Sequence, residues 1–242
     1  MKSLKRFYHF NEIDSTSAYL LRRRSVLRNF SFCSADYQTS GKGRTGRKWQ
    51  AASGENLLFS LLVSDKYLVN SFRLLSVASA VAVISACEKF GVKNLSVKWP
   101  NDVYADGKKV CGILLESVSD DGNISEIVIG IGINVNQTEF DGDFYREPTS
   151  LFLQTGKKID IRDFKKTVYK EIIRTFKSIK KDDLSFLDKA KSADFLKGKT
   201  MFAEIDGEKK QVTVIGIEKD GLKVIVDGIE KTLFYGEVSF HV

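Results

Sequence analysis

Short apolar stretches bounded by turn residues predict a series of β-strands in the first half of the chain. Residues 7–13 (FYHFNEI), 30–37 (FSFCSADY) and 56–63 (NLLFSLLV) each predict one strand. Residues 95–135 read as several strands, with hairpin turns expected at Asp106-Gly107 and Asp121-Gly122.

Three stretches have the pattern of helices. Asp14 or Ser15 is the expected N-cap of a helix in DSTSAYLLRRR, residues 14–24. Residues 70–90 repeat apolar side chains every three or four positions and end at Gly91, and residues 160–193 are helical and amphipathic.

The pattern changes near residue 195. From there on, short alternating strands with Asp-Gly turns are typical of a small β-barrel. We therefore expect an α+β domain over residues 1–194 and a small β module over residues 195–242.

The net positive charge of the chain favours anionic binding partners. The 242 residues carry a net charge of +7, and basic residues concentrate in 2–28, 41–48 and 156–181. Such a surface attracts nucleic acid, nucleotides or an acidic protein, and charge alone does not choose among them. A solvated helix face is the simpler interpretation of 156–181.

Cysteine and histidine usage excludes several classes of site. Cys33, Cys87 and Cys111 lack metal-binding spacing and lie among apolar residues, which indicates buried thiols in a reducing compartment. The only histidines, His9 and His241, do not readily build a metal site or a Ser-His-Asp triad. With no secretory signal and no stretch long enough to span a bilayer, we expect a cytoplasmic protein without a membrane partner.

The stretch QTSGKGRTGRKW (38–49) contains G-x-G-x-x-G at Gly41, Gly43 and Gly46. A dinucleotide site needs a helix after this motif, and too few residues precede the next strand. A phosphate-binding P-loop needs Ser or Thr after Gly-Lys, which is also missing. A cationic, glycine-rich loop that binds an anion through backbone and side chains remains, with a solvated basic hairpin as the alternative.

Three further segments carry polar groups suited to a nucleotide. KWPNDV presents Lys98, Asn101 and Asp102 at a bend. Lys98 could neutralise an α-phosphate oxygen, and the Asp102 carboxylate could bind Mg²⁺. The alternative is an ordinary surface turn. KKVCGILLE places Lys109 near Lys98, where the two would repel unless an anion lies between them; an exposed hairpin lysine is the alternative. GIGINVN offers Asn134 as donor and acceptor for an adenine edge, or else is a close-packed strand pair.

In this order and spacing, GKGRTGRKW, KWPND, KVCGILLE and GIGINVN resemble the biotin protein ligases, and DSTS and GEVS agree. The resemblance implies a mixed β-sheet flanked by helices, as in class II synthetase and biotin ligase catalytic domains, with an SH3-like C-terminal β module. The resemblance is to the class of biotin protein ligases that lacks an N-terminal DNA-binding domain, so no DNA partner is expected. The implied activity joins biotin to ATP as biotinyl-5′-AMP, with release of pyrophosphate, and then to a lysine of a biotin carboxyl carrier domain.

The resemblance also implies residue roles. Lys98, Lys109 and Arg44 are the expected catalytic residues. The expected biotin contacts are Ser15, Thr16, Gln38, Gly41, Lys42, Gly43, Arg44, Lys109 and Gly112. The expected nucleotide contacts are Lys42, Arg44, Arg47, Trp49, Lys98, Asn101 and Asn134, with Asp102 at Mg²⁺.

Three positions depart from the family pattern. Lys42 stands where Arg is usual, which predicts weaker retention of the intermediate because the bidentate fork is lost. Ser17 replaces an asparagine and is shorter, which removes the amide from any capping or pocket role. FHV replaces a basic ending, so these residues do not support a contact from the C-terminal module to ATP or carrier. The sequence does not decide whether the module docks the carrier or caps the catalytic domain.

Two other functions stay open from the residues. A lipoate protein ligase shares the fold and chemistry, but would not be expected to carry GKGRTGRKW or KWPND. A basic nucleic-acid-binding module would bind with strong salt dependence, but lacks aromatic residues between its basic runs. Monomer and homodimer are equally compatible with the sequence.

Overall fold

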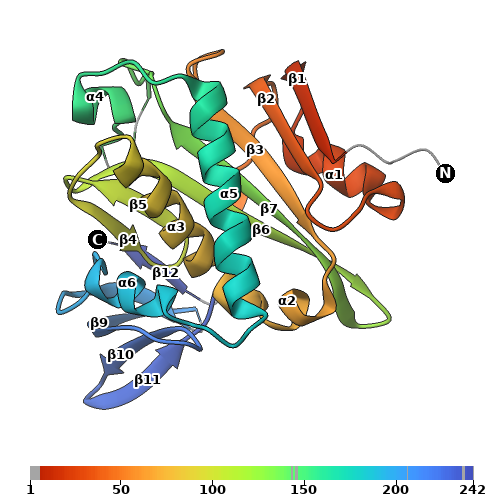
Figure 1. The fold of residues 1–242 in the computed structure, drawn as a ribbon. Coiled ribbons are helices and arrows are strands. Elements are labelled where there is room, and N and C mark those ends of the chain that lie inside the picture. The colour runs from red at the N-terminus through yellow and green to blue at the C-terminus, as the bar shows by residue number, and fades with distance from the viewer. Residues whose placement is uncertain (1–5, 143, 145–146, 206, 236–237, 242) are drawn as a thin grey trace.

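The computed structural model describes residues 6–142, 144, 147–205, 207–235 and 238–241, and only the backbone of Thr45 and of residues 238–241. Its main element is a mixed sheet with the strand order β1-β2-β3-β7-β6-β5-β4 (Figure 1). The strands are β1 (Phe7–Ile13), β2 (Phe32–Gln38), β3 (Asn56–Val63), β4 (Leu95–Lys98), β5 (Asp102–Ala105), β6 (Lys108–Asp120) and β7 (Asn123–Asn134). β1 and β2 are parallel, and every other neighbouring pair in this sheet is antiparallel.

Helices cover both faces of this sheet. They are α1 (Thr16–Arg23), α2 (Lys66–Asn70), α3 (Phe72–Lys89), α4 (Leu151–Thr155), α5 (Ile161–Ile179) and α6 (Phe186–Ser192), with short 3₁₀ turns at Arg24–Val26 and Arg44–Gly46. Ser15 caps α1 by accepting from the amide of Ala18, whereas Asp14 forms a two-point ion pair with Arg22. The Arg22 guanidinium lowers the pKa of Asp14 to about 2. Ser15, rather than Asp14, is therefore the N-cap.

A second, antiparallel sheet follows at the C-terminus. Its order is β11-β10-β9-β8-β12, formed by β8 (Thr200–Ile205), β9 (Glu208–Ile217), β10 (Leu222–Val226), β11 (Ile229–Leu233) and β12 (Val238–His241). Residues 193–195 run beside β4, with Val97 donating to Ala193 and Phe195 donating to Val97 through their backbones. A small antiparallel sheet is thus present after residue 195, as expected, and the segment that leads into it is attached to the edge of the main sheet.

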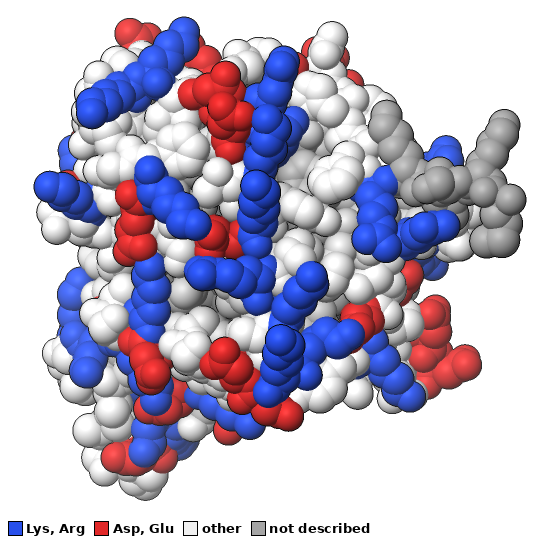
Figure 2. All heavy atoms as spheres, in the orientation of Figure 1, with Lys and Arg blue, Asp and Glu red and all other residues white. Residues whose placement is uncertain are grey.

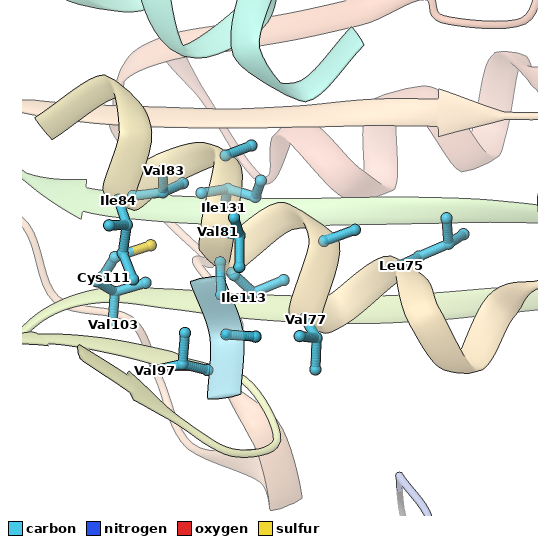
Figure 3. Close-up of a cluster of buried hydrophobic side chains, with 14 of the residues drawn as sticks. Leu75, Val77, Val81, Val83, Ile84, Val97, Val103, Cys111, Ile113 and Ile131 are labelled. Atoms are coloured by element: carbon cyan, nitrogen blue, oxygen red, sulfur yellow. The ribbon is translucent and has the colours of Figure 1, made fainter. Parts of the chain in front are cut away.

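The core lies between the main sheet and α3. In Figure 3, Val81 of α3 lies beside Ile113 and Ile131 of the sheet, and Ile84 lies beside Cys111 and Val103. α5 packs on the other side of α3, so α3 is buried on nearly every face. The opposite face of the sheet carries α1, whose Leu20 packs against Leu62. Residues that alternate with the core side chains along β3, β6 and β7 therefore face the α1 side.

Most predicted elements are confirmed, and one is wrong. Residues 56–63 form β3 as expected, and Asp106 and Asp121 begin the predicted turns with positive φ, each followed by a positive-φ glycine. The continuous helix expected over 160–193 is instead α5 and α6, because Asp182 adopts the left-handed conformation (φ 56°) in a polar stretch between them. α2 and α4 were not expected, since five residues are too few to show a helical period.

Basic side chains form a column over α5 (Figure 2). Arg162, Lys166, Lys170 and Arg174 recur four residues apart and are exposed. Acidic partners interrupt the column, since Lys166 pairs with Asp163 and Arg174 with Glu171. The column follows the outer face of α5, so it agrees with the simpler interpretation of residues 156–181 as a solvated helix face.

Replacing Leu75 by alanine tests the core. Leu75 is fully buried, so Leu75→Ala is expected to lower the free energy of unfolding by about 2–5 kcal/mol. Leu153→Ala is the control, because that side chain is 48% exposed, and it should change stability by less than about 0.5 kcal/mol. Urea denaturation measures both; equal losses in the two variants would contradict the packing described.

Candidate functional site

A cleft of about 790 Å³ opens on the α1 side of the main sheet, which is the usual size for a small-molecule site. Of the residues predicted from the sequence, it is lined by Ser15, Thr16, Gln38, Lys42, Gly43, Arg44, Arg47, Trp49, Lys98, Asn101, Asp102, Lys109, Gly112 and Asn134. Gly41 is the exception: it is buried and does not line the cleft, and its carbonyl accepts from the amide of Trp49. Predicted residues from Ser15 to Asn134, about half of the chain, therefore meet in one place.

A buried hydroxyl network forms one end of the cleft. Ser60 on β3 lies 2.7 Å from the Thr16 hydroxyl and 2.9 Å from the Ser17 hydroxyl. Gln38 at the end of β2 accepts from both the amide and the hydroxyl of Thr16. Gly130 leaves the space that Ser17 occupies, since a Cβ there would lie 2.8 Å from the Ser17 oxygen. The network offers donors and acceptors to a polar ligand while keeping its own groups paired.

The glycine loop is a hairpin between antiparallel strands. The amide of Gly43 donates to Arg47 and the amide of Arg47 donates to Arg44, which closes a tight turn where Gly46 has φ +75°. Residues 47–55 contain no α-helix, and β2 and β3 are antiparallel. The expectation that this motif is not a dinucleotide fingerprint is confirmed.

Trp49 lies flat on two paired glycines. Gly112 of β6 and Gly132 of β7 are opposite each other, and a Cβ on either would lie within 2.7 Å of the indole. The indole N–H is buried and donates to no acceptor among the described residues. Buried donors are normally satisfied, so this N–H is available to an acceptor that enters the cleft.

Each of three basic side chains in the cleft faces an acceptor from the protein itself. Lys109 lies 2.7 Å from a carboxylate oxygen of Asp102, and Lys42 lies 3.9 Å from Glu116. Arg44 donates to the side-chain oxygen of Asn101 at 3.1 Å. The sequence predicted that Lys98 and Lys109 would need an anion nearby, and Asp102 supplies a negative charge beside Lys109.

The structure gives two more facts about the predicted ligand contacts. Asn134 is 4% exposed and donates to the carbonyl of Thr149, so part of its donor capacity is already used. Among the described residues, no three His, Cys, Asp or Glu side chains form a metal-binding group. Any Mg²⁺ held with Asp102 would therefore take most of its ligands from substrate phosphates and water, as this cation commonly does.

The cysteines and His9 lie outside the cleft. Burial raises the pKa of Cys33 to about 12 and also raises the pKa of Cys87 and Cys111, so the thiols are unreactive, as expected. His9 does lie between Ser34 (3.1 Å) and Asp36 (3.5 Å), but Ser34 is 2% exposed and also contacts Lys165. This arrangement ties β1 and β2 to α5. The side chain of His241 lies outside the described part of the chain.

Sequence reasoning missed several residues in or beside the site, among them Ser60, Glu204 and Tyr235. A lone serine inside the apolar run NLLFSLLV was the available signal for Ser60. Glu204 of β8 lines the cleft, and Tyr235 stacks 5.5 Å from the guanidinium of Arg44. Through these two contacts the C-terminal module reaches the edge of the site. The side chains of GEVS and FHV, residues 236–242, lie outside the description.

Comparison with known proteins identifies the family of the chain. The model of the "Biotin/lipoate A/B protein ligase family" matches residues 10–134. The "Bifunctional ligase/repressor BirA" of Escherichia coli is 30% identical over 230 residues, which cover 94% of this chain and 71% of that protein. The chain belongs to the biotin/lipoate A/B protein ligase family.

Other members of this biotin/lipoate ligase family extend the likeness. A crystal structure of the biotin protein ligase of Aquifex aeolicus, in complex with biotin and ATP, is 30% identical with a TM-score of 0.86, covering 98% of this chain and 99% of that one. The "Biotin--[acetyl-CoA-carboxylase] ligase" of Paracoccus denitrificans is 32% identical over 158 residues, or 62% of this chain and 65% of that protein. In the part of this ligase that the structure describes, no helix has the length and apolarity needed to cross a membrane.

Substituting Gly132 tests the contact between this glycine and the Trp49 indole. Gly132→Ala would place a methyl group 2.5 Å from the indole, so Trp49 is expected to move toward solvent. The measurement is fluorescence in a Trp99→Phe background, where Trp49 is the one remaining tryptophan of two. We expect a red-shifted emission and stronger acrylamide quenching.

Ile131→Val is the matched control, since that side chain points into the core on the other face of the sheet. It should leave the Trp49 emission unchanged. An unchanged emission in Gly132→Ala as well would show that the indole does not rest on this glycine pair.

Proposed function

We propose that this protein is an ATP-dependent biotin protein ligase that attaches biotin to a lysine of a biotin carboxyl carrier domain. The observation that carries the proposal is the convergence of Lys42, Arg44, Lys98 and Lys109 on one cleft beside a buried hydroxyl network. The family includes lipoate ligases, but the Aquifex and Paracoccus relatives are named as biotin ligases. Lipoate is therefore the alternative substrate to test.

In the first step, an oxygen of the biotin carboxylate attacks the α-phosphorus of ATP. The bond from that phosphorus to the bridging oxygen breaks, pyrophosphate leaves, and biotinyl-5′-AMP remains. Two anions must approach each other, so fixed positive charge is the main requirement. Lys109 is proposed to hold the carboxylate, and Lys98, Lys42 and Arg44 to hold the α-phosphate oxygens.

The remaining predicted residues are proposed to position the substrates. Ser15, Thr16 and Gln38 are suited to the polar ring of biotin, because they form the hydroxyl and amide end of the cleft. Trp49, Asn101 and Asn134 are proposed to contact the nucleotide, with Arg47 near the phosphates. Asp102 would help to hold the Mg²⁺ bound with ATP, and the cation would supply charge neutralisation for the leaving pyrophosphate.

In the second step, the uncharged amine of a carrier lysine attacks the acyl carbon of the adenylate. The bond from that carbon to the phosphate oxygen breaks, AMP leaves, and an amide forms. The protein then needs only to orient the two groups and keep water away from the mixed anhydride. The loop of residues 41–49 folds over the sheet at this place and is suited to both tasks.

Three further statements belong to this proposal. The chain divides at residue 194 into a catalytic domain and a C-terminal β module. It acts in the cytoplasm, where ATP is available and buried thiols stay reduced. It works as a monomer or homodimer on the carrier domain of a carboxylase.

The function is tested by pyrophosphate release from ATP and Mg²⁺ with biotin or with lipoate. We expect release with biotin, and biotin transfer when a carrier domain is added. Release with lipoate alone would favour the alternative, and release with neither would refute the proposal.

Lys109→Ala tests the central residue. Loss of the charge that meets the carboxylate is expected to slow adenylate formation about 10²–10³-fold, as for other groups that stabilise transition-state charge. Lys108→Ala is the matched control, because the neighbouring lysine pairs with Glu147 and does not line the cleft. Near-normal rates in Lys109→Ala, with the same thermal stability as the control, would contradict the assignment.

A further inference from the structure

The segment before β12 lies beside the cleft and contacts Arg44, one of its lining residues. Phe234 packs against the guanidinium of Arg73 on α3, with the guanidinium 4.5 Å from the ring centre. Next to it, Tyr235 lies 5.5 Å from the guanidinium of Arg44, within the distance of a cation–π contact. The small β-sheet therefore touches the glycine loop through one aromatic side chain.

The hydroxyl of Tyr235 completes the hydrogen bonding of β6. β5 begins at Asp102, opposite Gly112, so within the described part of the chain β6 has no strand neighbour on this side beyond that pair. The next backbone donors there find other acceptors: Ile113 donates to the carbonyl of Asn101, and Leu115 donates to the Tyr235 hydroxyl at 3.3 Å. Tyr235 is thereby fixed by the main sheet as well as by its own module.

The same strand fixes the other neighbour of Arg44. Asn101 donates from its side-chain amide to the carbonyl of Ile113, and its side-chain oxygen accepts from Arg44. The Arg44 guanidinium thus contacts both the Asn101 side chain and the Tyr235 ring. Each of these is hydrogen-bonded to the backbone of β6, Asn101 at the carbonyl of Ile113 and Tyr235 at the amide of Leu115. Burial raises the pKa of Tyr235, and the positive charge of Arg44 opposes part of that shift.

We propose that Tyr235 is a positioning residue that holds Arg44 in place, so that the C-terminal module supports the adenylation step through this contact. The proposal rests on the proposed biotin ligase function, since it assumes that Arg44 meets the adenylate phosphate. It gives the C-terminal module a specific part in the reaction. Long basic side chains on a glycine-rich hairpin have many conformations, and an anchored ring reduces them before substrate binds.

The first test uses the protein without substrates. Trypsin cleaves after Lys42, Arg44, Arg47 and Lys48, and mass spectrometry reports the rate of cleavage within residues 42–48. Tyr235→Ala is expected to raise this rate about fivefold, the change that corresponds to one cation–π contact. Tyr235→Phe keeps the ring but loses the hydroxyl that accepts from Leu115, so its rate is expected between those of the wild type and Tyr235→Ala.

Phe202→Ala is the matched control, because Phe202 is an aromatic residue of the same sheet that is 47% exposed and lies under Lys209. It should leave cleavage unchanged. Equal cleavage in wild type, Tyr235→Ala and Phe202→Ala would overturn the proposal without reference to the enzyme activity.

The second test is a double-mutant cycle on pyrophosphate release with biotin and ATP. If Tyr235 acts through Arg44, Tyr235→Ala should slow release in the wild-type background and have no further effect in an Arg44→Ala background. Losses that multiply in the double variant would show that Tyr235 acts elsewhere, and would overturn the proposal. No release by wild type would refute the ligase function instead, and the cleavage rates would still decide whether Tyr235 holds the loop.

Discussion

The structure depends on bringing several positive charges into one partly buried cleft without losing stability. Like charges at short range repel, and the repulsion grows as water is removed. The fold offsets it with acceptors of its own: Asp102 beside Lys109, Asn101 beside Arg44 and Glu116 facing Lys42. The basic side chains are thus held near the positions that the proposed reaction needs before any substrate arrives.

The sheet provides the frame for this arrangement. Lys98, Asp102 and Lys109 lie on three neighbouring strands, and the glycine pair at 112 and 132 leaves the flat surface that Trp49 covers. α3 and α5 bury the opposite face, which fixes the strand register. The same alternation along a strand therefore separates core side chains from cleft side chains.

Much of this could be predicted from the sequence, because its signals are local. The apolar run of β3, the Asp-Gly turns and the order of the four motifs are all visible in short windows. The break between α5 and α6 was missed because amphipathic spacing continues on both sides of Asp182, while the left-handed residue leaves no periodic signal. Tyr235 was missed for a different reason. Its contact with Arg44 joins residues 191 positions apart through tertiary packing, and nothing near Tyr235 in the sequence indicates it.

The most direct test of the account is a crystal structure of the protein with biotin and a non-hydrolysable ATP analogue. The account predicts the biotin carboxylate at hydrogen-bond distance from the Lys109 ammonium, with an α-phosphate oxygen beside Lys98 and Arg44. Both ligands should occupy the cleft between the hydroxyl network and Trp49. A carboxylate bound away from Lys109, or a nucleotide outside this cleft, would contradict it.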